Sequence, residues 1–119
     1  WTELENYVSS QSQYVCGGDE DKIAKALASE EGWYGYYGEC AVGDNPSTNN
    51  ATGFSARPAG TYSVYKNSYF YLDCDAFFWS ATQRKSNYAY DRLLLYSYAG
   101  VHRNYSDKNN GHSVRCVRN

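Results

Sequence analysis

Residues 76–98 carry the sequence AFFWSATQRKSNYAYDRLLLYSY, and two strand patterns in this stretch decide the fold. Residues 76–82 form an apolar, aromatic run with the length of one strand, which predicts a buried central strand. Residues 88–98 alternate with the period of two that places successive side chains on opposite faces of a sheet. One face is expected to hold Tyr90, Arg92, Leu94 and Tyr96, and the other Asp91, Leu93, Leu95 and Ser97.

Shorter strand patterns flank this pair on both sides. From Thr61 onward, aromatic and β-branched residues in short runs favour strands. These residues are Tyr62, Val64, Tyr69 and Tyr71. Residues 100–105 and 112–118 are predicted to be two more strands, joined by residues 107–111, which end in an Asn-Gly pair that favours a hairpin turn. We therefore expect five or so antiparallel strands in the C-terminal half.

Two helices are expected before the strands. Residues 1–9 place apolar side chains on one helix face, and Thr2 with Glu5 matches a capping box. Residues 19–30 carry a second apolar stripe, begin with an aspartate that can cap a helix, and end before a glycine. Residues 32–61 contain turn-forming residues throughout and predict an irregular loop. Helices followed by antiparallel strands predict an α+β fold.

Length and composition fit a single domain and exclude several classes of partner. The chain has 119 residues, which is the size of one domain, so residues 1–119 are expected to form a single unit. The formal net charge is −2, which provides no basic surface for nucleic acid. No apolar run approaches the roughly 20 residues of a membrane span, so we expect no membrane insertion. Fourteen residues are tyrosine, which is typical of binding faces.

Motifs for catalysis, cofactors and metals are absent from the sequence. It contains no serine-hydrolase elbow, phosphate-binding loop, dinucleotide glycine pattern or zinc-binding helix. His102 and His112 have no evident nucleophile as a partner. Asp44, Asp73 and Asp75 could contribute calcium ligands, but no dense acidic loop surrounds them. We therefore expect a protein that is not an enzyme and that uses no cofactor and no metal.

The even number of cysteines in a small, loop-rich chain favours disulfides and an oxidising compartment. The cysteines are Cys16, Cys40, Cys74 and Cys116. The chain contains no Cys-x-x-Cys pair, so a thiolate zinc site is not expected. Of the three possible pairings, we favour Cys16–Cys40, around the second helix, with Cys74–Cys116, between the central and last strands. A reduced second pair is the alternative.

Nearly the whole chain resembles one bacterial domain family. The matching C-terminal residues are Phe78 to Thr82, Asn87 to Tyr90, Leu94, Tyr96, Val101, Lys108, Asn110, Gly111 and residues 113–118. The matching N-terminal residues are Trp1, Leu4, residues 23–28, Gly32, Trp33, residues 40–43 and residues 50–60. This pattern is similar to the Fibrobacter succinogenes major paralogous domain, which occurs in secreted and surface proteins of Fibrobacter and Bacteroidetes-type bacteria. The resemblance implies a C-type-lectin-like fold of the sulfatase-modifying-factor kind, with two helices, a twisted antiparallel sheet and long irregular loops.

The chain departs from the family pattern at its start. The family's Cys-Pro-x-Gly-Trp-His-Leu-Pro stretch, which precedes the position of Trp1, is missing. A truncated N-terminus and a lost partner for Cys116 therefore stay open. The motifs by which C-type lectins bind sugars through calcium are also missing, as are the paired cysteines of formylglycine-generating enzymes. The resemblance thus implies secretion, surface display and binding, without a known reaction.

The resemblance also implies variable positions in the C-terminal half. Related lectin-type proteins are diversified by retroelements that mutate adenines and so replace Asn codons. Family members often carry Asn where this chain has Tyr88, Asp91, Leu93, Leu95, Ser97, Tyr98, His102, Tyr105 and Asp107. On the alternating strand, Leu93 and Leu95 would then face outward, and two exposed leucines suggest contact with a ligand. In the alternative, they face a second layer of core, and Leu94 with Tyr96 is the exposed pair.

We therefore expect an extracellular or surface-displayed bacterial domain, part of a larger surface protein, that binds a carbohydrate or a protein without catalysis. Its ligand face is expected on residues 88–112. The expected contacts are the aromatic platforms Tyr88, Tyr98 and Tyr105, the apolar anchors Leu93 and Leu95, and the polar residues Asp91, His102, Asn104 and Asp107. The alternative is a structural or assembly module of a surface protein or filament, in which tyrosine-rich strands join subunits.

Overall fold

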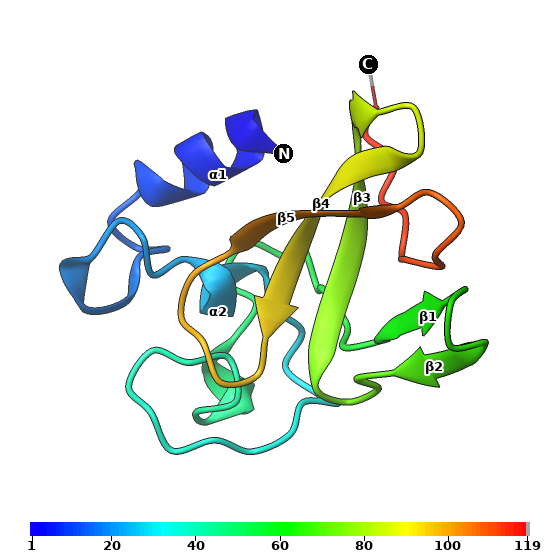
Figure 1. Ribbon diagram of the computed structural model, residues 1–119. Coiled ribbons are helices and arrows are strands. Elements are labelled where there is room, and N and C mark those ends of the chain that lie inside the picture. Colours follow the sequence, from blue (N-terminus) through cyan, green and yellow to red (C-terminus); the bar gives the residue numbers. More distant parts are fainter. Residues whose placement is uncertain (119) are drawn as a thin grey trace.

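The fold is built on one three-stranded antiparallel sheet whose strands follow chain order. These strands are β3 (Asp75–Lys85), β4 (Tyr88–Leu95) and β5 (His102–Asp107). A separate hairpin lies near the start of β3 (Figure 1) and consists of β1 (Thr61–Ser63) and β2 (Ser68–Phe70). The computed structural model describes residues 1–118, so the last residue of the expected domain, Asn119, lies outside the described residues.

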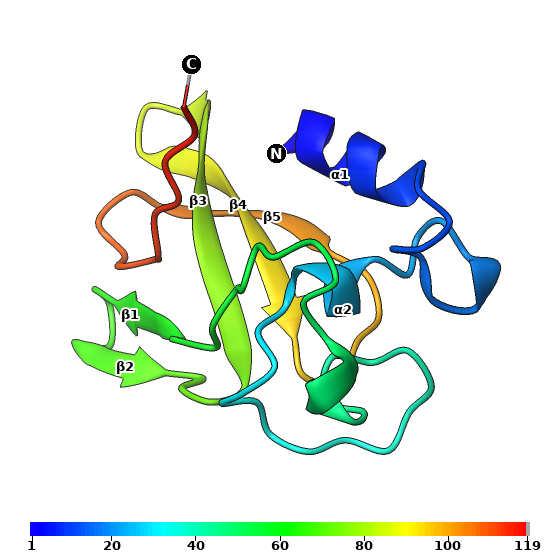
Figure 2. The same ribbon diagram turned by 180° about the vertical axis from the view of Figure 1, so that it is seen from behind.

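Two short helices precede the strands, which makes the fold α+β, as predicted. They are α1 (Thr2–Ser9) and α2 (Ala24–Leu27). Single turns of 3-10 helix lie at Cys16–Gly18 and Pro46–Thr48. Seen from behind, the long connection after α2 wraps around that helix before it reaches β1 (Figure 2). This connection is irregular, as the sequence predicts for residues 32–61.

The second helix is one turn long, so the prediction of a helix over residues 19–30 is wrong at both ends. Asp19 caps a turn rather than a helix, because its Oδ1 accepts the backbone N–H of Asp21 at 3.1 Å. At the other end, Ala28 is already extended, with ψ 150°, and pairs with Ala56 in a parallel bridge. Tertiary hydrogen bonds therefore replace the helical ones that the apolar stripe favours.

α1 forms where the sequence predicts it, but the expected capping box is absent. Trp1 is the N-cap residue, and no side chain caps the helix. Glu5 instead forms an ion pair with Arg92 of β4, whose side chain is only 4% exposed. The ring of Trp1 packs on Phe78 of β3, with 5.5 Å between ring centroids. These contacts hold α1 against one face of the sheet, which we call the α1 face.

β4 is buried on both faces, so its alternation does not separate a core side from a solvent side. Arg92 and Leu94 lie toward the α1 face, and Asp91 and Leu93 lie toward the opposite face, which we call the His112 face. All four are buried. The expected exposure of Leu93 and Leu95 is wrong, because Leu93 is 9% exposed and Leu95 is half-buried. The alternative of a second core layer is correct for Leu93, but its exposed pair is wrong, because Leu94 is buried and Tyr96 is half-buried.

The C-terminal segment supplies that second layer without forming a strand. The predicted strand over residues 112–118 is wrong, because the only pairing there is one isolated bridge, at Ser113. Ser113 pairs with Phe78 in a parallel bridge. Its N–H donates to the carbonyl of Phe77 at 2.9 Å, and its carbonyl accepts the N–H of Trp79 at 3.0 Å. The segment therefore runs along β3 and covers part of the His112 face.

The turn over residues 107–111 forms, but it does not close the predicted hairpin. Asn110 N–H donates to the carbonyl of Asp107 at 2.9 Å, as in a tight turn. The chain then leaves β5, and Gly111 pairs with Tyr62 of β1 through two hydrogen bonds of 2.9 and 3.0 Å. The turn thus connects the three-stranded sheet to the β1–β2 hairpin.

The strand ends also differ from the predicted ones. β3 is longer than residues 76–82, and β4 stops at Leu95 because the chain then turns toward the long loop. Tyr96 N–H donates to the carbonyl of Cys74 at 3.0 Å, and the carbonyl of Tyr96 accepts the N–H of Gly43 at 2.7 Å. β5 consequently begins at His102, two residues later than predicted.

One of the two expected disulfides forms. Cys16 and Cys40 are bonded and lie on opposite sides of α2 in the chain, whereas Cys74 and Cys116 are free. The expected Cys74–Cys116 bond is wrong because the parallel pairing at Ser113 directs the C-terminus away from Cys74. Ser113, three residues before Cys116, already lies beside Phe78, which is four residues or roughly 13 Å along the chain from Cys74. A disulfide tolerates about 7 Å between Cα atoms.

Candidate binding site

The structure divides the expected ligand contacts into inner and outer groups. The buried or half-buried inner residues are Asp91, Leu93, Leu95 and Asp107. The outer residues, exposed or partly exposed, are Tyr88, Tyr98, His102, Asn104 and Tyr105. Four of the outer residues form two contact groups, Tyr88 with Tyr105 and Tyr98 with His102.

Asp91 belongs to an internal polar cluster, so its expected outward position is wrong. Its side chain is fully buried, and its Oδ2 accepts the hydroxyl of Ser106 at 2.6 Å. The same oxygen lies 3.2 Å from Nε2 of His112, whose ring lies 4.2 Å from that of Trp79. Oδ1 of Asp91 has no hydrogen-bond partner among the described residues. The cluster joins the C-terminal segment to β4 and β5.

Leu93 and Leu95 also fail as an exposed apolar pair. Leu93 pairs with Phe77 in the sheet, and both are buried. Phe77 in turn stacks on Tyr71, with 5.9 Å between ring centroids. Leu93 therefore stabilises the sheet and is not the outward anchor that the sequence suggests, whereas Leu95 is half-buried at the end of β4.

The first outer group, the Tyr105 cluster, consists of Tyr105, Tyr88 and Arg84. The guanidinium of Arg84 lies over the ring of Tyr105, 3.4 Å from its centroid, in cation–π geometry. Tyr88 meets the same ring edge-on, with 6.0 Å between centroids. Tyr105 remains 45% exposed. The cluster is therefore a surface aromatic site that is ordered by its own neighbours.

Asp107 anchors the end of β5 rather than facing outward. Its Oδ2 accepts the hydroxyl of Tyr65 at 2.6 Å, and its Oδ1 accepts the backbone N–H of Asn109 at 2.9 Å. The hydrogen bond with Asp107 raises the pKa of Tyr65 to about 12. The same bond, helped by Asn109, lowers the pKa of Asp107. This pair fixes the β1–β2 hairpin against the three-stranded sheet.

The second outer group, the Tyr98 pair, consists of Tyr98 and His102. Their rings stack with 4.3 Å between centroids and 29° between planes, and Tyr98 is 47% exposed. Gly100 makes this arrangement possible, because a Cβ there would lie 2.9 Å from the Tyr98 ring. Burial raises the pKa of the nearby Asp75 carboxyl, and His102 opposes that rise. The stacking on His102 fixes one face of the Tyr98 ring.

A third aromatic surface was not expected from the sequence, and we call it the Tyr36 loop. It consists of Tyr34, Tyr36 and Tyr37, which are all exposed. Tyr34 and Tyr36 both pack edge-on against Tyr96, at 6.2 and 5.9 Å between centroids. The Tyr-Gly composition of residues 33–38 resembles that of antibody binding loops, and this signal could have identified the loop.

The described residues contain no cluster of metal-ligating side chains, and one of their two free thiols, Cys74, has a raised pKa. Within residues 1–118, no three His, Cys, Asp or Glu side chains gather closely enough to hold a metal ion. Burial, with help from Asp75 and Asp73, raises the pKa of the Cys74 thiol, which disfavours the reactive thiolate. In the same part of the chain, no helix has the length and apolar character needed to cross a membrane.

The fold and these surfaces define a small, disulfide-bonded α+β domain with exposed, ordered tyrosines. Residues 1–118 match the family model of the Fibrobacter succinogenes major domain, and the chain belongs to this family. The family that the sequence suggests is therefore confirmed. Searches of curated proteins and of solved structures gave no match.

Proposed function

We propose that this domain is a non-catalytic binding module that recognises a carbohydrate or a protein through exposed tyrosines of β4, β5 and their connection. One observation carries the proposal. Tyr98 and Tyr105 are each almost half exposed, yet each is already held by a neighbouring side chain, His102 or Arg84. A ligand therefore meets ordered aromatic surfaces, and binding loses less side-chain entropy than it would on a mobile surface.

The location and the finer fold are part of the same proposal. The Cys16–Cys40 disulfide supports an oxidising compartment, as for a secreted or surface-displayed bacterial protein. Two helices followed by antiparallel strands, with a long irregular connection, support a C-type-lectin-like fold. Membership of the family supports both points, and it supports a place in a larger surface protein.

A binding screen on glycan arrays and bacterial surface-protein arrays tests the function. The screen compares the intact domain, the domain in EDTA, and the variants Tyr98→Ser and Tyr105→Ser. Tyr7→Ser is the matched control, because Tyr7 is 58% exposed on α1 and belongs to neither outer group. We expect hits that survive EDTA and the control but weaken in at least one test variant. An absence of hits, or hits indifferent to both test variants, contradicts the proposal.

A structural or assembly module is the second candidate. Two observations favour it: Cys116 is an exposed thiol without a partner in the described chain, and tyrosines are exposed on several elements. In such a module the isolated domain associates with itself. Size-exclusion chromatography over a concentration series, with and without reductant, distinguishes the two candidates. A domain that stays monomeric at high concentration contradicts the assembly reading.

A further inference from the structure

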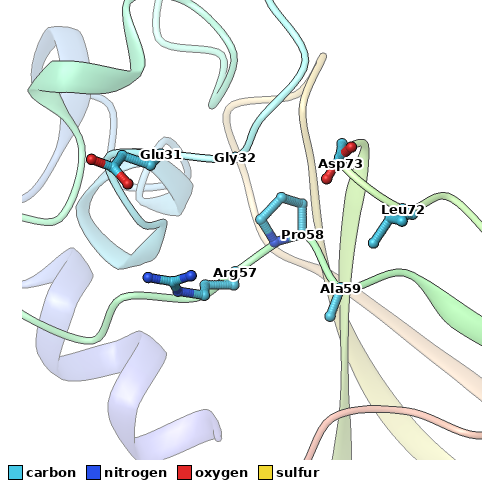
Figure 3. A pocket seen from close by; sticks show the side chains of 7 residues that line it. All are labelled: Glu31, Gly32, Arg57, Pro58, Ala59, Leu72 and Asp73. Atoms are coloured by element: carbon cyan, nitrogen blue, oxygen red, sulfur yellow. The ribbon is translucent and has the colours of Figure 1, made fainter.

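A pocket between three loop segments carries polar side chains that no other part of the structure uses. Figure 3 shows Glu31 and Arg57 on one side of it, Asp73 and Leu72 on the other, and Pro58 between them. The pocket has a volume of about 290 Å³. This is at the small end of the range for ligand sites and fits one ring-sized ligand.

Backbone hydrogen bonds hold the pocket walls in fixed positions. Asp73 N–H donates to the carbonyl of Pro58 at 2.9 Å, and the carbonyl of Asp73 accepts the N–H of Tyr34 at 2.7 Å. Asp73 therefore links the two other wall segments. Ser29 N–H donates to the carbonyl of Ala56 at 2.8 Å and joins those two segments directly. A ligand meets a preformed site, which lowers the entropic cost of binding.

The charged side chains of the pocket have no partners within the described part of the chain. The ion pairs and side-chain hydrogen bonds found in residues 1–118 include none from the side chains of Glu31, Arg57 or Asp73. An ionised carboxylate only accepts hydrogen bonds, and a guanidinium only donates them. All three residues are exposed, so a ligand that both donates and accepts hydrogen bonds can reach both kinds of group. Hydroxyl groups donate and accept, and a pyranose presents several of them around one ring.

Other ligand classes fit the pocket less well. Two carboxylates and one guanidinium give a net negative charge, which disfavours an anion. A metal ion is disfavoured because no cluster of three ligating side chains occurs in residues 1–118. A free amino acid offers one ammonium group, whereas Glu31 and Asp73 line opposite sides of the pocket (Figure 3). One carboxylate would then stay unmatched.

A second hollow extends the pocket in one direction. It has a volume of about 410 Å³, shares Gly32 and Asp73 with the first, and adds Trp33 and Tyr34. Tyr34 is 62% exposed, so its ring can pack against the apolar C–H face of a further sugar ring. We propose that the two hollows together, the Arg57 groove, bind a neutral pyranose oligosaccharide. This site shares no residue with the Tyr105 cluster or the Tyr98 pair.

NMR titration of the whole domain with neutral oligosaccharides tests this site. The panel contains gluco-, xylo-, manno- and galacto-configured chains at millimolar concentration, with uronic-acid oligosaccharides and free amino acids as contrasting probes. We expect at least one neutral chain to shift the backbone amide signals of Gly32, Tyr34 and Asp73. Signals that respond only to amino acids or uronic acids, or to nothing in the panel, overturn the proposal.

Single substitutions show which side chains of the groove contribute to the affinity for the oligosaccharide. Arg57→Ala and Glu31→Ala change exposed side chains, so we expect a folded domain and an affinity reduced by about tenfold or more. Glu30→Ala is the matched control, because Glu30 is the neighbouring exposed acid and does not line the groove. Asp73→Asn is a further test that keeps the backbone, since Asp73 has φ 62° and asparagine tolerates this region. Equal affinity in all variants contradicts the site.

The experiments can refute the groove proposal and the proposed function of the tyrosine surfaces independently of each other. If Tyr98→Ser or Tyr105→Ser abolishes array binding, and no oligosaccharide shifts the amide signals of the groove, the groove proposal is wrong and the proposed function stands. If Arg57→Ala abolishes oligosaccharide binding, and both tyrosine variants bind normally, the groove proposal stands and recognition through the tyrosine surfaces is wrong.

Discussion

Nε2 of His112 lies 3.2 Å from Oδ2 of Asp91, and both side chains are buried, at 1% and 0% exposure. The two residues are far apart in sequence, and their contact closes the C-terminal segment over the His112 face of the sheet. It also explains why Asp91, which sits at a position expected to face outward, is inside the protein.

Replacing His112 with alanine is expected to destabilise the domain by about 3 kcal/mol. The change removes a ring packed against Trp79 and leaves the buried Asp91 with only Ser106 as a hydrogen-bond donor. Urea denaturation measures the loss. His102→Ala is the control, because that ring is half-buried, and we expect it to lose less than about 1 kcal/mol. Equal losses in the two variants would count against the buried cluster.

Glu5→Ala is expected to destabilise the domain by about 3 kcal/mol, because it leaves the guanidinium of Arg92 buried without its partner. Glu3→Ala changes the exposed acid in the same first turn of α1 and should stay within about 0.5 kcal/mol of the parent. Thermal and urea unfolding of both variants give the comparison. A Glu5→Ala domain as stable as Glu3→Ala would show that α1 is not held by this pair.

The structure predicts one disulfide and two free thiols, those of Cys74 and Cys116. Under non-reducing conditions, peptide mapping should show the Cys16–Cys40 bond alone. Replacing both bonded cysteines with serine should cost about 3 kcal/mol, since their separation of 24 residues closes a sizeable loop in the unfolded chain.

Thiol reactivity in the native state provides a second check. The exposed Cys116 should react faster than Cys74, whose pKa is raised by burial. A Cys74–Cys116 bond in the peptide map, or a faster Cys74, would contradict the structure.

The hydrogen bond between Tyr65 and Asp107 gives a pH dependence with a defined sign. Its contribution to stability is complete below pH 10, the ordinary pKa of tyrosine, and is lost as pH rises through about 12. It is also lost as pH falls below 3.8, because the pKa of Asp107 is lowered from that ordinary value. We expect the urea midpoint of Tyr65→Phe to lie below that of the parent between these limits and to approach it outside them. A constant difference from pH 3 to pH 12 would refute this.

Elements with a local cause could be predicted from the sequence. The aromatic run around Phe78 and the alternation of β4 correctly locate the central strands, and the first disulfide follows from the position of Cys16 and Cys40 around α2. The helix predicted over residues 19–30 fails because its apolar stripe is satisfied by burial among distant partners such as Ala56 rather than by further helical turns. Long-range pairing of this kind has no local pattern.

The candidate site was less predictable for the same reason. A period of two shows that Asp91 and Leu93 share a face, but it does not show that the C-terminal segment covers that face. The Tyr36 loop and the Arg57 groove depend on contacts between residues far apart in the chain, such as Tyr34 with Asp73. Among the expected contacts, Tyr98, Asn104 and Tyr105 are exposed surface residues, as the sequence suggests.

The most direct measurement is the equilibrium affinity of the strongest array hit for the double variant Tyr98→Ser/Tyr105→Ser, for Tyr7→Ser and for the parent domain. Both tyrosines of the double variant are partly exposed, so matched unfolding temperatures should show that all three proteins are folded. We predict that the double variant binds at least about tenfold more weakly, a loss of about 1.4 kcal/mol, while Tyr7→Ser binds like the parent. Equal affinity in all three proteins would contradict recognition through these tyrosines.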